Sequence, residues 1–148
     1  MSKNEEMTDK IAMRIIQSMA HNRNNFKNKV GEYIGGALIE FYKAQLATKN
    51  GQFKYVSHWM SEVDSLLKRS LFVLMKHPIR GFKNRRKAVE EMINYLKSKD
   101  KSYRRGAEHI IKKDFGLTNL KSNIDDTDTH AFWEVVYDVI DNALTDEE

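Results

Sequence analysis

The sequence has no cysteine, one proline and only seven glycines among its 148 residues. Without cysteine there is no disulfide, no thiol nucleophile and no thiolate ligand for a metal. So few prolines and glycines leave too few turn residues for a fold of many short strands. No apolar run approaches the ~20 residues of a membrane-spanning helix, and the first residues lack the apolar core of a signal peptide. We therefore expect a cytoplasmic protein that makes no membrane contact.

Apolar residues recur instead at helical spacing, in six stretches separated by polar connectors. The expected helices cover a stretch behind Thr8, residues 26–47, 54–77, 84–97 and 102–115, and a last stretch opened by the acidic run at 125–128. A chain of 148 residues is long enough to bury a core of its own. The pattern predicts an all-α, compact bundle of about six helices that forms a single domain over residues 1–148.

Several residues predict how these helices pack and end. The helix over 54–77 carries the longest apolar stripe and is expected to be the central, most buried one, with Pro78 ending it. Gly35 and its neighbours are expected to let another helix approach closely. Gly51 and Gly116 suit left-handed positions after helix ends. Trp59 and Trp133 are both expected in the core.

Charge is distributed very unevenly along the chain. Residues 66–113 hold fifteen Lys or Arg against four acids, whereas residues 114–148 hold ten acids and one Lys. A basic cluster on neighbouring helices is typical of proteins that bind nucleic-acid backbone, RNA or DNA. The predicted contacts are Lys68, Arg69, Lys76, Arg80, Lys83, Arg85, Arg86, Lys87, Arg104, Arg105, Lys112 and Lys113.

Within this set, Arg85, Arg86, Arg104 and Arg105 are the expected main anchors, because a guanidinium can bridge two phosphate oxygens. Phe82 and Tyr103 lie among the basic residues and are expected to stack on bases. The region carries no signature of base-specific readout. Binding by charge neutralisation, with other protein subunits as further partners, is therefore the favoured interpretation.

Three alternatives stay open at this point. The basic residues could form a solvated face, since Arg86 and Lys87 each precede a glutamate by one helical turn. The acidic segment could fold back and mask the basic region. The protein could also be a small interaction or inhibitor protein, from a phage or mobile element, that docks its basic face on an acidic partner.

Metal and nucleophile chemistry find little support in the sequence. The five histidines never fall four residues apart on one helix. Asp125, Asp126 and Asp128 lack the glycine and distal glutamate of a calcium loop, and we interpret them as helix-capping acids. No serine lies in a glycine-framed nucleophile elbow. The sequence therefore indicates no metal, no cofactor and no small-molecule substrate.

One pattern does suggest catalysis. Arg104, four intervening residues and His109 resemble the Arg-x4-6-His motif of HEPN ribonucleases, which are small, all-helical and usually dimeric. The resemblance implies that Arg104 and His109 act on RNA at the scissile phosphate. Arg105 departs from the Asn, His or Gln common after the arginine, and residues 14–21 fit the same loose pattern. Otherwise His109 is expected to be an exposed residue of its helix.

A second resemblance covers residues 29–77. Tyr33, a glycine three residues on, Leu38 and then Gln45, followed by a long apolar helix, resemble the C-terminal helical segment of type I CRISPR large subunits. That segment is similar in role to the CRISPR small subunit, a basic helical protein of the RNA-guided surveillance complex. The resemblance implies repeated copies that contact guide RNA, heteroduplex or displaced strand.

Overall fold

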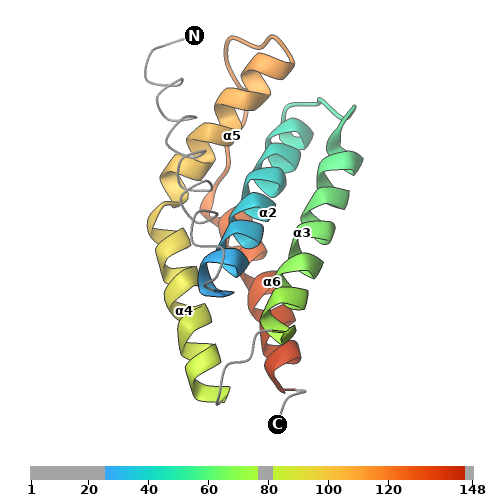
Figure 1. Ribbon diagram of the computed structural model, residues 1–148. Coiled ribbons are helices and arrows are strands. Elements are labelled where there is room, and N and C mark those ends of the chain that lie inside the picture. Colours follow the sequence, from blue (N-terminus) through green and yellow to red (C-terminus); the bar gives the residue numbers. More distant parts are fainter. Residues whose placement is uncertain (1–25, 77–81, 146–148) are drawn as a thin grey trace.

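A computed structural model of the chain describes residues 26–76 and 82–145, with side chains over 29–75 and 86–143 (Figure 1). These residues form five α-helices and no strand, which confirms the all-α class for the described part. The helices are α2 (Phe26–Lys49), α3 (Val56–Lys76), α4 (Phe82–Ser98), α5 (Asp100–Asp114) and α6 (Asp126–Thr145). The count is five rather than six, and the helix expected behind Thr8 lies outside the described residues.

Helix α2 is the centre of the bundle. It runs antiparallel to α3 on one side, while α4 and α5 lie on the other side and α6 crosses behind it (Figure 1). Its apolar and small residues surround the whole helix, as expected of a helix buried on all sides. Those that are almost fully buried are Val30, Ile34, Ala37, Leu38, Tyr42, Ala44, Leu46 and Ala47. The prediction that the helix over 54–77 is the most buried was therefore wrong, because α3 leaves Phe72 and Met75 exposed.

Glycine in α2 allows the close approach that the sequence predicted. A Cβ built on Gly35 would stand 2.9 Å from the Tyr103 hydroxyl and 3.4 Å from a Leu96 methyl. At the next residue, a Cβ on Gly36 would stand 3.4 Å from Leu66 of α3. Both flanking layers therefore reach the α2 backbone at this level of the bundle.

The helix ends follow local chemistry. Gly51 and Gly116 have φ values of 73° and 63°, the left-handed conformation predicted for them. Helix α3 ends at Lys76, two residues before Pro78, which itself lies outside the described residues. At the start of α6, the Asp128 backbone N–H donates to Asp125 and the Asp125 N–H donates to Asp128, both at 3.0 Å. This reciprocal capping confirms that these acids serve the helix start.

Aromatic side chains join α6 and α3 to the core. Trp59 and Trp133 are both buried, as predicted. The Phe132 ring lies 5.4 Å from Phe41 of α2 and 5.1 Å from Trp133, while Trp59 meets Phe115 edge-on at 6.1 Å. Tilted and edge-on ring pairs of this kind stabilise a core beyond their buried area.

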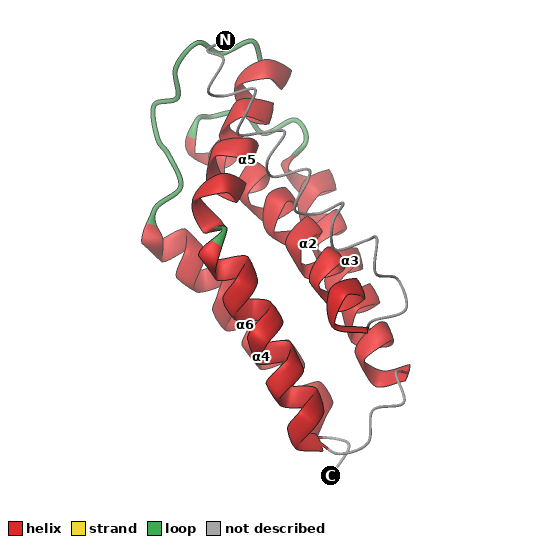
Figure 2. Cartoon of the chain, turned by 60° about the vertical axis from the view of Figure 1, so that its left-hand side comes forward, coloured by secondary structure: helices red, strands yellow, loops and turns green. Residues whose placement is uncertain are grey.

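Helices α4 and α5 follow one another almost along one line, with only Lys99 between them (Figure 2). The Lys99 backbone N–H donates to the Leu96 carbonyl oxygen, 3.1 Å away, so hydrogen bonding continues across the junction and no loop separates the two helices. Together they present a long rod against α2. No helix within the described ranges has the length and apolar character to cross a membrane.

Candidate nucleic-acid interface

The predicted basic contacts divide into three groups in the structure. The first group is exposed and consists of Lys68 and Arg69 on α3, Lys87 on α4, and Arg105 and Lys113 on α5. The second group, Lys76, Arg80, Lys83 and Arg85, has side chains outside the described residues, as does Phe82. The third group, Arg86, Arg104 and Lys112, is held by acidic side chains. The predicted continuous basic face is therefore partly neutralised.

Acids of the C-terminal segment account for much of this neutralisation. Arg86 Nη1 lies 2.5 Å from a carboxylate oxygen of Asp141, and Arg104 Nη2 lies 3.0 Å from Asp126. Both acids belong to α6. Lys112 instead pairs with Glu108 of its own helix at 3.2 Å. The alternative in which the acidic segment folds back on basic residues thus holds for Arg86 and Arg104.

Arg104 joins α5 to α6 through several contacts. Its Nε lies 2.7 Å from Asp100 one turn earlier, and its Nη2 also donates to Thr129 at 2.6 Å. Only 24% of the side chain is exposed. Burial opposes the charge, but the hydrogen bond that Arg104 donates to Asp126 and the negative charge of Asp100 outweigh it and raise the Arg104 pKa. Arg104 is therefore a structural cation, and this corrects its predicted role as a main anchor.

The same junction contains Tyr42, Gln45 and Lys49 of α2, of which the sequence had pointed only to Gln45, through the CRISPR resemblance. The Tyr42 hydroxyl donates to Asp100 and lies 2.9 Å from the Thr129 hydroxyl. Lys49 forms an ion pair with Asp128, whose other oxygen accepts a hydrogen bond from Gln45 at 3.0 Å. These partners lie 58 to 87 residues apart in sequence, so local patterns carry no signal of the contacts.

Two further predictions, for Tyr103 and His109, are wrong because both side chains are buried. Tyr103 is completely buried, so its ring is not available to stack on a base. His109 was expected to be exposed, yet only 4% of it is accessible. In a regular helix, residues five apart point about 140° away from each other, so Arg104 and His109 lie on different faces of α5. Neither residue is presented as the HEPN resemblance implies.

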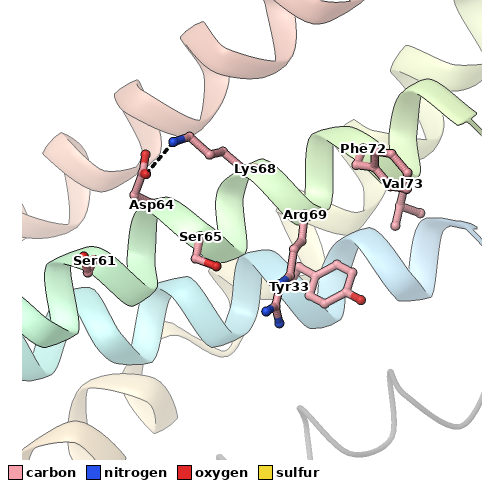
Figure 3. A pocket seen from close by; sticks show the side chains of 8 residues that line it. All are labelled: Tyr33, Ser61, Asp64, Ser65, Lys68, Arg69, Phe72 and Val73. Carbon is pink, nitrogen blue, oxygen red and sulfur yellow. Dashed lines mark ion pairs between the residues drawn. The ribbon is translucent and has the colours of Figure 1, made fainter.

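A groove of about 600 Å³ between α2 and α3 holds two of the exposed cations (Figure 3). It is lined by Tyr33 of α2 and by Ser61, Asp64, Ser65, Lys68, Arg69, Phe72 and Val73 of α3. Arg69 extends across α2 beside the Tyr33 ring (Figure 3). Within the part of the chain that the structure describes, the Arg69 side chain has no ion pair or hydrogen bond. Its guanidinium donors are therefore available to an anion.

Lys68 lines the same groove and forms only a weak ion pair. Its Nζ lies 2.8 Å from Asp64, and the two side chains are 75% and 66% exposed. An exposed pair one helical turn apart contributes only about 0.3–0.5 kcal/mol, so a phosphate can exchange for the carboxylate. The groove thus offers two cations against one acid.

A second cavity, of about 380 Å³, lies at the Arg104 junction and differs in chemistry. It is lined by Lys97, Asp100, Arg104, Asp126, Thr129, His130 and Trp133. Here the acids Asp100 and Asp126 already hold the Arg104 guanidinium. The α2–α3 groove is consequently the better anion site. The described residues contain no group of three His, Asp or Glu side chains arranged to hold a metal ion.

Comparison with known proteins gives no guide to this site: no family model, no curated protein and no solved structure matches the chain. The functional argument therefore rests on the residues and their geometry. The CRISPR resemblance stays a prediction from the sequence.

Proposed function

We propose that this protein is a non-enzymatic, cytoplasmic helical subunit that binds nucleic-acid backbone without sequence preference inside a larger nucleoprotein complex. The observation that supports it is the set of exposed cations on α3, α4 and α5, above all Arg69 in the α2–α3 groove. Each lysine or arginine that meets a phosphate releases condensed counterions, which drives association. Because such contacts touch phosphate and not base edges, they give affinity without sequence preference.

Burial and pairing favour binding over catalysis. The HEPN resemblance would need both Arg104 and His109 within reach of the scissile phosphate, whereas His109 is buried and Arg104 is held by Asp100 and Asp126. The predicted contacts that are exposed are all lysines and arginines, which neutralise charge but are poor proton-transfer groups at neutral pH. The larger complex is proposed from the resemblance to CRISPR large and small subunits.

The test is fluorescence anisotropy of the purified protein with labelled single-stranded RNA, single-stranded DNA and duplex DNA over a salt series. If about five phosphates are engaged, log K should fall with log salt at a slope near −3.5 on single strands and near −4.5 on duplex. Scrambling the sequence of the probe should leave the affinity unchanged. Absence of binding at low salt to all three probes would overturn the proposal.

The protein-docking alternative makes a different prediction. A small inhibitor that uses its basic surface on an acidic protein should retain one defined partner after nuclease treatment of a lysate. A nucleic-acid-binding subunit should lose its co-purifying material under the same treatment. The anisotropy measurement remains decisive, because it uses only purified components.

A further inference from the structure

Cations and rings alternate along the α2–α3 groove. Arg69 lies beside the Tyr33 ring, with Ser65 one turn earlier on the same face of α3 (Figure 3). Lys68 and Phe72 are likewise one turn apart on α3 and also line the groove, with Lys68 extending in the opposite direction from Arg69 (Figure 3). Phe72 is 60% exposed, so much of its ring surface is accessible from solvent.

This alternation matches the chemistry of a nucleotide strand. A guanidinium donates two parallel hydrogen bonds to a phosphate, and serine and tyrosine hydroxyls add further donors. An aromatic ring next to the phosphate site offers a surface on which a base can stack. In a duplex the base faces are already stacked on each other, so rings in a protein groove contribute only when the strand is single.

From these contacts we infer that the α2–α3 groove binds single-stranded nucleic acid, with Arg69 and Lys68 on phosphates and Tyr33 and Phe72 stacked on bases. The inference rests on the proposed function and deepens it, because it selects one surface and one strand type. It places the stacking rings on α2 and α3, whereas the sequence had suggested Phe82 and Tyr103.

The first experiment compares two arginines of equal charge. Arg69→Ala removes the cation of the groove, and Arg105→Ala removes an exposed arginine from α5. Binding of a labelled single-stranded oligonucleotide should weaken about tenfold in Arg69→Ala, as expected for loss of a charge-assisted hydrogen bond to phosphate. Arg105→Ala should change it less than about threefold. Both side chains are exposed, so circular dichroism should show that both variants fold normally.

The second experiment separates the ring of Tyr33 from its hydroxyl. Tyr33→Phe keeps the stacking surface and should retain most of the single-strand affinity. Tyr33→Leu keeps an apolar side chain without a ring and should weaken single-strand binding about tenfold, since a stacked base contributes ~1–3 kcal/mol. Duplex binding should be the same in wild type and both variants.

A gain of affinity provides the third test. Asp64 is the acid of the groove and pairs with Lys68. Asp64→Asn should strengthen single-strand binding about threefold, because it removes a negative charge next to the phosphate path and releases Lys68. Glu90→Gln, which removes one exposed acid from α4, is the matched control and should have a smaller effect.

The outcomes distinguish the groove from the broader proposal. If wild type binds no nucleic acid at low salt, the proposed function fails and the groove inference fails with it. If wild type binds but Arg105→Ala loses as much affinity as Arg69→Ala, the groove is not the site, although backbone binding stands. If Tyr33→Leu weakens duplex and single-strand binding equally, selection of single strands is wrong.

Discussion

Gly35 of α2 and Tyr103 of α5 pack so closely that a Cβ on the glycine would stand 2.9 Å from the tyrosine hydroxyl oxygen. The Tyr103 ring is rigid and fully buried, so it cannot swing into solvent to make room. Its hydroxyl has no hydrogen-bond partner among the described residues. The contact therefore fixes the distance between α5 and the central helix by shape alone.

Gly35→Ala is expected to lower the free energy of unfolding by about 1–3 kcal/mol, the usual cost of forcing extra volume into a packed core. This reverses the gain of up to ~1 kcal/mol that alanine normally gives over glycine inside a helix. Urea unfolding measures the difference. Gly36→Ala is the matched control: its nearest contact is 3.4 Å from Leu66, and it should be neutral or stabilising.

The clash also predicts a specific rescue. Tyr103→Phe removes the oxygen that a Cβ would meet and also removes a buried hydroxyl without a partner, so alone it should cost little. Combined with Gly35→Ala, it should restore most of the lost stability. An equally destabilised double variant would show that the cost arises elsewhere, for example at Leu96.

The spacing of apolar residues was sufficient to predict where the helices lie in the sequence, but not which helix is most buried in the bundle. Expected boundaries for α2 to α5 lie within two residues of the observed ones, because apolar spacing and the glycines Gly51 and Gly116 act locally. Which helix is central depends on how the whole set packs. The long apolar stripe of α3 suggested the wrong helix, whereas the small residues of α2 allow neighbours on every side.

The candidate site was less predictable, because exposure depends on distant partners. Arg104 and Arg105 are equivalent in the sequence, yet one is held by Asp100 and Asp126 while the other faces solvent. Likewise, the sequence pointed to Tyr33 only through the CRISPR resemblance and not as a contact residue, although the structure places it beside Arg69. The charge composition indicated an anion-binding surface. Only the packing shows which cations are held by acidic side chains and which are exposed to bind an anion.

Alkaline pH should destabilise the fold through two tyrosines. Burial raises the pKa of the Tyr103 hydroxyl above its usual value of 10.0. Burial and the hydrogen bond to Asp100 raise that of Tyr42 in the same direction. A raised pKa means that the folded state holds the proton more tightly, so this stability is complete below about pH 10 and is lost as pH rises further.

Urea unfolding between about pH 8 and pH 11 should therefore show falling stability above pH 10, with a limiting slope of ~1.4 kcal/mol per pH unit for each tyrosine. The Tyr42→Phe, Tyr103→Phe double variant should lose this part of the pH dependence. The slope is the relevant readout, because removing the Tyr42 hydrogen bonds also changes the absolute stability. An unchanged slope in the double variant would contradict the assignment.

Arg104 is expected to affect stability much more than its neighbour. Arg104→Ala leaves the Asp100 carboxylate, only 16% exposed, without its closest cation and should cost about 3 kcal/mol. Arg105→Ala, at an exposed position of the same helix, should stay within about 0.5 kcal/mol of wild type. Thermal unfolding of the two variants tests the distinction. Equal stabilities would return Arg104 to the set of available nucleic-acid contacts.

Asp141 provides a test of masking by α6. Its carboxylate lies 2.5 Å from Arg86, and the two side chains are 51% and 35% exposed, so the pair adds less than about 1 kcal/mol to stability. Asp141→Asn should leave folding intact and raise nucleic-acid affinity about threefold at low salt. The reason is that a neutral Asn no longer competes with phosphate for the Arg86 guanidinium. Asp138→Asn removes the same charge from an exposed position of α6 and should raise affinity less. Equal increases would mean that only net charge matters and that Arg86 makes no direct contact, which would leave the exposed cations of α3, α4 and α5 as the binding surface.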